Sequence, residues 1–217
     1  MPRNPNCTAC ILHTSSKHVC VWGTGDGEGF AVGEAPGKEE SRTGEPFRGQ
    51  AGKLLRPILA EFGLPDPYIT NVAKCRPPEN RKPEPDEIRA CRPYLLEEIE
   101  DKNPAAILLM GATAMKAILN RTGITEMNGQ VVNKDGRIYV CSFHPAAILR
   151  DPSKMDALRM AIGRYAQVVK GNFNPKMPDV RAIDKHTIDE FLSDWFVATE
   201  MAFDVETAGD QDGEGLE

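Results

Sequence analysis

The most constraining feature of this sequence is the alternation of short apolar runs with longer amphipathic stretches, which continues to about residue 170. Apolar runs of strand length lie at 30–32, 68–72 and 105–110, and a further strand is expected at 137–142. Amphipathic stretches of helix length lie at 51–62, 86–100, 113–119 and 153–169. Strands that alternate with helices favour a parallel sheet covered on both faces. We therefore predict an α/β fold, a three-layer α/β/α sandwich around a central, mostly parallel four-stranded sheet.

The segment before the last predicted strand carries two turn dipeptides, Asn128-Gly129 and Asp135-Gly136. Their positions indicate a hairpin in the residues between them. The helix predicted at 153–169 is expected to be closed by Gly171, a residue type common just after helix ends. These elements together define a main domain over residues 1–172.

A second, incomplete domain is expected after this helix. Residues 173–186 are a predicted linker, because they contain Pro175 and Pro178 and show no hydrophobic period. Residues 187–196 show a helical pattern that begins with a capping box formed by Thr187 and Glu190, and 201–205 is typical of a buried strand. The sequence ends about a dozen residues later, so we expect 187–217 to be the truncated start of a further domain.

Composition and charge exclude several classes of protein. The 217 residues are 41% hydrophobic, which suits a domain with a substantial core and is too much for a disordered chain. No stretch approaches the roughly 20 apolar residues that span a bilayer, and the N-terminus lacks the apolar region of a secretory signal, so we expect a soluble, cytoplasmic protein with no membrane partner. Residues 176–217 carry 3 basic and 12 acidic side chains, whereas the whole chain has a net charge of -6. The preceding residues therefore have a net charge of +3, which suits a polyanionic partner.

The spacing of the cysteines points to a metal site. Six cysteines in a chain expected to be intracellular favour metal binding or catalysis over disulfides, because cytosolic thiols stay reduced. The candidate ligands are a C-x2-C pair, Cys7 and Cys10, and two separate cysteines, Cys75 and Cys91. A zinc ribbon normally has a second close pair, so an iron–sulfur cluster suits these residues at least as well as zinc, and four ordinary thiols are the alternative. Cys20 and Cys141 lie in apolar surroundings and are expected in the core.

Polar residues follow three of the predicted strands. Glu34, Asn71 and His144 each lie at or just after a strand end, and parallel strands end at one edge of a sheet, where ligands bind. Each of these residues alone is more often structural than catalytic. Phosphate-binding motifs fail, because the Gly37-Lys38 and Gly52-Lys53 pairs lack the other residues of a P-loop. The expectation is therefore a site at this edge that is not a nucleotide-phosphate site.

A basic segment begins after the second predicted strand and continues into the helix-length stretch at 86–100. Its basic residues are Lys74, Arg76, Arg81, Lys82, Arg89 and Arg92. Acidic residues are interleaved with them, so the segment is interpreted either as a phosphate track or as a mixed-charge solvated surface.

Four stretches taken together resemble the motifs of a known family. They are GEAPGKEE at 33–40, RTGEPF at 42–47, TNVAKCRPP at 70–78 and HPAAILR at 144–150. In this order they are similar to the motifs of the family 4 uracil-DNA glycosylases, and the similarity covers about residues 5–170. The resemblance implies a uracil-DNA glycosylase-like fold, uracil-containing DNA as partner, and a 4Fe-4S cluster held by Cys7, Cys10, Cys75 and Cys91.

The resemblance also implies roles for individual residues of a uracil pocket. Gly33 and Phe47 line the pocket, and the Phe47 ring stacks on the flipped base. The Asn71 carboxamide donates to uracil O4 and accepts from N3–H, which cytosine does not allow. His144 donates to uracil O2 as negative charge develops, and Glu34 orients or activates the attacking water. Family 1 enzymes have GQDPY where this chain has Ala35 and Gly37, so no residue is assigned to the exclusion of thymine.

The C-terminal part resembles a different protein. The sequence Phe203-Asp204-Val205-Glu206-Thr207 is similar to the start of the proofreading exonuclease domain of a family A DNA polymerase, and phage polymerases with a preceding glycosylase-like domain are known. The resemblance implies a monomer covalently continuous with polymerase domains. The leading hypothesis is thus a hydrolase that removes uracil from DNA. The alternatives are a non-catalytic module that senses uracil or grips DNA, and a purely structural iron–sulfur domain.

Overall fold

The structure is a computed structural model that describes residues 4–173. Nearly all of the predicted linker at 173–186 and the whole exonuclease-like segment at 187–217 lie outside the described residues. Within residues 4–173, no helix combines the length and the apolar character needed to cross a membrane.

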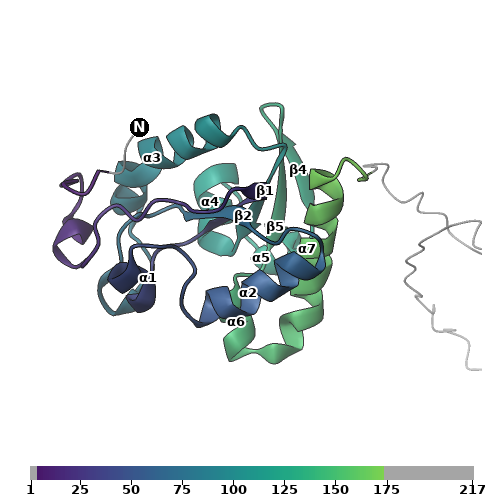
Figure 1. Cartoon of the computed structure of the whole chain (residues 1–217), viewed down its shortest axis with the longest axis horizontal. Helices are drawn as coiled ribbons and strands as arrows, with labels where there is room; N and C mark the ends of the chain where they lie inside the picture. The colour runs from purple at the N-terminus through teal and green to yellow at the C-terminus, as the bar shows by residue number, and fades with distance from the viewer. Residues whose placement is uncertain (1–3, 174–217) are drawn as a thin grey trace, which may run out of the picture. The chain divides into compact units, whose positions relative to one another are not determined.

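A single mixed sheet forms the middle of this domain (Figure 1). Its strands are β1 (Gly27–Gly33), β2 (Pro67–Asn71), β3 (Ala106–Met110), β4 (Val131–Lys134) and β5 (Arg137–Ser142), in the order β2-β1-β3-β5-β4. The first, second, third and fifth strands run parallel, and β4 pairs antiparallel with β5. The α/β sandwich with a mostly parallel sheet is confirmed.

The prediction of four strands is corrected to five. The extra strand, β4, is the first arm of the hairpin indicated by the turn dipeptides. Asp135 and Gly136 both have positive φ, 53° and 75°, the geometry that joins two antiparallel strands most tightly. β4 has only four residues and one buried side chain, Val132, so it carries too little apolar pattern to be predicted as a strand of its own.

Helices cover both faces of the sheet. They are α1 (Lys38–Thr43), α2 (Gln50–Glu61), α3 (Pro85–Lys102), α4 (Ala112–Leu119), α5 (Ile124–Met127), α6 (Pro145–Arg150) and α7 (Met155–Val169). Figure 1 shows α3 and α4 on one side of the strands and α2, α6 and α7 on the other. The four helices predicted before residue 170 are all present, with ends shifted by a few residues, whereas the helix predicted at 187–196 lies outside the described residues. The three unpredicted ones, α1, α5 and α6, have four to six residues each, too few to show a helical period.

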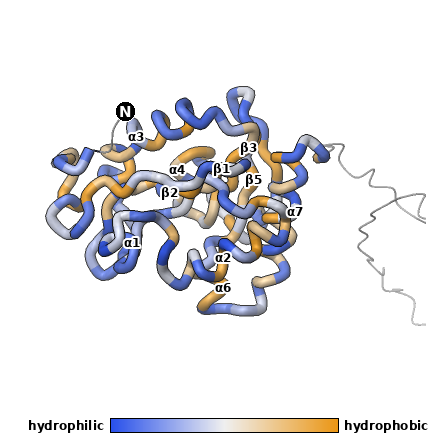
Figure 2. Tube along the Cα trace, in the orientation of Figure 1, coloured by the Kyte–Doolittle hydropathy of each residue, from blue (hydrophilic) through white to orange (hydrophobic). Residues whose placement is uncertain are grey.

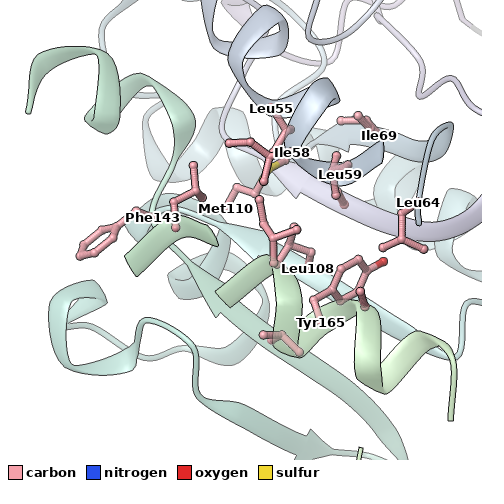
Figure 3. Packing of buried hydrophobic residues seen from close by; sticks show 14 of the residues in the cluster. Leu55, Ile58, Leu59, Leu64, Ile69, Leu108, Met110, Phe143 and Tyr165 are labelled. Carbon is pink, nitrogen blue, oxygen red and sulfur yellow. The ribbon is translucent and has the colours of Figure 1, made fainter. Parts of the chain in front are cut away.

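Two cores result, one on each face, because successive side chains of a strand point to opposite sides. On the α2/α7 face, Leu55 and Leu59 of α2 lie near Leu108 of the sheet and Tyr165 of α7 (Figure 3). On the α3/α4 face, alternate strand residues such as Phe30 and Val32 meet the apolar stripe of α3. Figure 2 shows the rest of α3 as hydrophilic, since only its inner stripe is buried. Because helices cover both faces of the sheet, ligands can reach it at the ends of its strands.

Candidate active site

The carboxyl ends of the parallel strands meet at one edge of the sheet. Gly33 at the end of β1 is paired in register with Asn71 at the end of β2, and Met110 at the end of β3 is paired with Ser142 at the end of β5. Glu34 follows β1 directly, and His144 follows β5 after one intervening residue. The polar residues predicted from separate strands are therefore brought to the same edge.

At Gly33, the Asn71 carboxamide and the Phe47 ring approach the backbone of β1 closely. A Cβ at position 33 would lie 2.6 Å from Asn71 Oδ1 and 2.7 Å from Phe47 Cζ. Real Cβ atoms do not approach other heavy atoms so closely, so only glycine allows the carboxamide and the ring to meet over this strand. Asn71 and Phe47, both predicted to share a pocket with Gly33, thus both approach the Gly33 backbone closely.

Asn71 has a buried carboxamide at this edge of the sheet. The residue is 1% exposed, and its Oδ1 has no hydrogen-bond partner among the described residues. A buried polar atom without a partner costs about 1–3 kcal/mol, so native proteins rarely leave one. The arrangement favours a ligand that donates a hydrogen bond to this oxygen.

Phe47 is held in an unusual backbone conformation. Its φ is 53°, in the left-handed region that bulky residues rarely occupy. A Cβ at Gly52 in α2 would lie 1.8 Å from the Phe47 carbonyl oxygen, and Arg56 Nε donates to the same oxygen at 3.4 Å. The Phe47 ring is 5% exposed and its centroid lies 5.6 Å from that of the His144 ring. Helix α2 therefore fixes the ring beside Asn71 and His144.

His144 is a neutral hydrogen-bond donor at this edge. It is the N-cap of α6, where its Nδ1 accepts from the backbone N–H of Ala146 at 3.1 Å. An accepting Nδ1 places the ring proton on Nε2, which is then free to donate. Burial, aided by the positive charge of Arg150, lowers the pKa of His144 to about 4. Gly111 allows this packing, since a Cβ there would lie 2.9 Å from His144 Cβ.

We expect His144 to gain its proton only as the pH falls towards 4, rather than near its ordinary pKa of 6.5. The unfolded chain binds this proton first, so the contribution of His144 to stability is lost as the pH falls from about 6.5 towards 4. An NMR titration of the imidazole, assigned with His144→Gln because the chain has 4 histidines, measures the midpoint. A midpoint near 6.5 would show that the ring is neither buried nor held in this tautomer.

Glu34 is positioned by a residue that the sequence analysis missed. Thr113, in the first turn of α4, donates its hydroxyl hydrogen to Glu34 Oε2. The two residues are 79 positions apart, and they meet where the chain order of the sheet reverses around β1 and β3. Neither the apolar period nor a motif marks Thr113; only its place in the first turn of a helix after a strand is a signal.

The basic segment is mainly a structural surface. Arg81 forms an ion pair with Glu87, and Arg89 with Asp86. Lys74 is 1% exposed and pairs with the buried Glu98, so it is not available to a phosphate. Arg81 and Arg89 therefore fit the mixed-charge surface, whereas the buried Lys74 fits neither interpretation.

The four candidate cluster cysteines lie in one neighbourhood. Cys75, just after β2, and Cys91, in α3, are each 4% exposed, and Cys7 and Cys10 are half-buried. Burial raises the pKa of Cys91 to about 12, and Cys10 and Cys75 add to this rise. The pKa of Cys75 is likewise raised by burial, with smaller contributions from Cys10 and Cys7. These influences indicate that the four thiols, from segments far apart in the sequence, lie within range of electrostatic interaction.

The sulfurs also accept hydrogen bonds, as the thiolates around iron–sulfur clusters do. Backbone N–H groups of Cys20 and Lys74 donate to the sulfurs of Cys75 and Cys91 at 3.4 and 3.3 Å. Within residues 4–173, however, no three Cys, His, Asp or Glu side chains already form a metal-binding group. Four cysteine thiols, two of which accept backbone hydrogen bonds, are the ligand type that an iron–sulfur cluster requires. The positions of these thiols do not match the geometry of cluster ligands. Cys20 and Cys141 are buried, as predicted.

Comparison with known proteins identifies the family. The model of the uracil DNA glycosylase superfamily matches residues 24–166. The chain belongs to this superfamily. The Type-4 uracil-DNA glycosylase of Thermotoga maritima is 43% identical over 157 residues, which cover 70% of this chain and 82% of the relative. The Type-4 enzyme of Archaeoglobus fulgidus is 42% identical over 159 residues, 68% of this chain and 80% of the relative. A DNA polymerase of Bacillus phage SP01 is 34% identical over 143 residues, 64% of this chain but 16% of the polymerase.

The region that matches the uracil DNA glycosylase superfamily contains every residue of the strand-edge site. Gly33, Glu34, Phe47, Asn71 and His144 lie within the matched range, as do Cys75 and Cys91. Cys7 and Cys10 precede it.

Proposed function

We propose that this chain excises uracil from DNA by hydrolysing the bond between the base and deoxyribose. The observation that carries the proposal is the buried Asn71 carboxamide, whose Oδ1 lacks a hydrogen-bond partner within residues 4–173 and points towards Gly33. Uracil has an N3–H donor beside the O4 acceptor, so one carboxamide satisfies both and is itself satisfied. The names of the Type-4 relatives support the same activity.

The other residues of the edge suit the remaining steps. A base must leave the DNA stack before its glycosidic bond is reached, and the buried Phe47 ring offers it a surface to stack on. Negative charge then builds on the leaving uracil, and the Nε2–H of neutral His144 donates to O2 as it develops. Glu34, held by Thr113 through one oxygen, keeps its other oxygen for the attacking water.

We infer that Cys7, Cys10, Cys75 and Cys91 hold a 4Fe-4S cluster. The buried thiols, their mutual influence and the N–H groups aimed at two of the sulfurs support this. Such a cluster, when bound, ties the N-terminal segment to the end of β2 and to α3. Because Cys75 is only four residues beyond Asn71, this tie also steadies the strand end that carries the carboxamide.

Purified protein is expected to be brown and to contain about four irons per chain. Cys91→Ser should lose the iron and lower the melting temperature more than it lowers the rate of excision per folded molecule. Cys141→Ala, which removes a buried cysteine outside the proposed ligand set, should keep the iron. Iron analysis, visible absorption and thermal unfolding measure these effects. Colourless protein with stoichiometric zinc after anaerobic preparation would contradict the cluster.

We also infer that the domain is the monomeric N-terminal part of a DNA polymerase. The phage SP01 polymerase, in which the similar region is 16% of the length, supports this, as does the Asp204-x-Glu206 pattern. Two carboxylates with this spacing share one face of a strand, as in a two-metal nuclease site. Sequencing the coding region beyond codon 217 tests the inference: exonuclease and polymerase motifs are expected, and a stop codon there would contradict it.

The activity is tested with uracil-containing oligonucleotides, single-stranded and double-stranded, followed by alkaline cleavage at abasic sites. Strand breaks at the uracil position are expected. Tight binding of uracil-containing DNA without breaks would instead favour a uracil-sensing module.

A further inference from the structure

Glu40 is a buried carboxylate that the proposed reaction does not use. It lies in α1, between the turn that carries Glu34 and the loop that carries Phe47, and it is 8% exposed. The sequence around it, Lys38-Glu39-Glu40, is typical of a solvated charged helix. A carboxylate so buried requires strong compensating hydrogen bonds.

Both oxygens of Glu40 accept from the backbone. Oε2 accepts from the N–H of Gly37 at 3.0 Å, and Oε1 accepts from the N–H of Gly49 at 2.7 Å. These two N–H groups are the N-caps of α1 and α2, so one negative charge lies at the positive ends of two helices. A Cβ at 37 would lie 2.8 Å from Oε2, and one at 49 would lie 3.2 Å from Oε1. Glycine at 37 therefore favours the close approach, whereas at 49 a shift of the Glu40 side chain by a few tenths of an ångström would accommodate a Cβ.

The bond to Gly37 alone is an ordinary capping box of α1. The bond to Gly49 is not, because it spans nine residues and joins two separate helix starts. Gly37 lies three residues after Glu34, and Gly49 lies two residues after Phe47. The Glu40 carboxylate is thus a bridge between the turn and the aromatic loop.

The aromatic loop requires such a bridge. Phe47 has a left-handed backbone conformation, which persists only where surrounding contacts hold it. Gly52 and Arg56 of α2 lie close to its carbonyl oxygen. Glu40 holds Gly49, the residue that connects the Phe47 loop to the start of α2.

We propose that Glu40 is a positioning residue that locks the Phe47 loop to the Glu34 turn and so sets the spacing between the stacking ring and the water-activating carboxylate. This role rests on the proposed function. Glu40 itself touches neither base nor water. It acts by accepting hydrogen bonds from the backbone N–H groups of Gly37 and Gly49, and this requires a side chain with two accepting oxygens.

Glu40→Gln tests the proposal, because an amide has one accepting oxygen and turns an N–H donor towards the second backbone N–H. We expect kcat/KM for uracil excision to fall about 10- to 100-fold, since misplacement by about 1 Å costs up to 100-fold. Glu39→Gln is the matched control: it removes the same charge from the neighbouring position, where the side chain is 47% exposed and pairs only with Arg42 among the described residues. It should behave as wild type.

A double-mutant cycle separates positioning from general destabilisation. If Glu40 acts through the ring, Glu40→Gln should cost no more than about threefold in a Phe47→Ala background, because coupled residues are not additive. Equal losses in both backgrounds would overturn the proposal, as would activity equal to that of Glu39→Gln. If Glu40→Gln does not fold, Glu40→Asp replaces it, since its charge is kept but its shorter side chain cannot bridge both N–H groups; the same losses and the same coupling are expected. Wild-type protein without excision would instead overturn the proposed function.

Discussion

Asn71→Ala is expected to abolish uracil excision while leaving the fold intact. A site built to hydrogen-bond a substrate loses about 10³-fold or more when the pairing is removed, because the remaining polar groups are left without partners. Asn71 Oδ1 has no partner among the described residues in the free protein, so its removal should not lower the melting temperature. The measurement is single-turnover excision, combined with thermal unfolding.

Asn71→Asp gives the complementary test. An ionised carboxylate has no donor for uracil O4, so uracil excision should fall sharply. A protonated Asp presents a donor beside an acceptor, the pattern that cytosine N3 and N4 complement, so any base newly excised should be cytosine. Uracil excision unchanged in both variants would remove Asn71 from the pocket.

Gly33→Ala is expected to cost at least about 100-fold in uracil excision. Gly33 does not have a positive φ, so alanine requires no unusual backbone conformation there. Its methyl group would instead lie 2.6 Å from Asn71 Oδ1 and 2.7 Å from the Phe47 ring. The ring or the carboxamide must move, at a cost in stability of about 1–3 kcal/mol.

Binding of DNA without uracil to Gly33→Ala distinguishes a filled pocket from an unfolded protein. We expect the DNA backbone to be bound outside the uracil pocket, so affinity for this DNA should be preserved. Excision at the wild-type rate would show that the floor of the pocket lies elsewhere.

The sequence predicts the sheet edge well because the rule behind it is local. Strand-length apolar runs place Asn71 and His144 at strand ends, and parallel strands bring those ends together whatever the loops do. The hairpin was also indicated by its turn residues. Its first arm was missed as a sheet strand because four residues with one buried side chain show no period.

The supporting residues are less accessible to sequence reasoning. Thr113 and Glu40 act through contacts with residues in other elements, and each looks like an ordinary surface position in its own segment. Lys74 belongs to a basic segment, yet it is buried against Glu98 from α3, a partner 24 residues away. Burial of a charge depends on tertiary partners, which neither period nor composition shows.

Release of free uracil from a uracil-containing oligonucleotide tests the central claim most directly. Incubation with the purified wild-type chain, followed by mass spectrometric detection of the free base and alkaline cleavage of the strand, measures both products of one bond cleavage. We expect equal amounts of free uracil and abasic sites, with multiple turnovers per enzyme, and no base release from the same sequence containing thymine or cytosine. Uracil-containing DNA that is bound but recovered intact would contradict this claim.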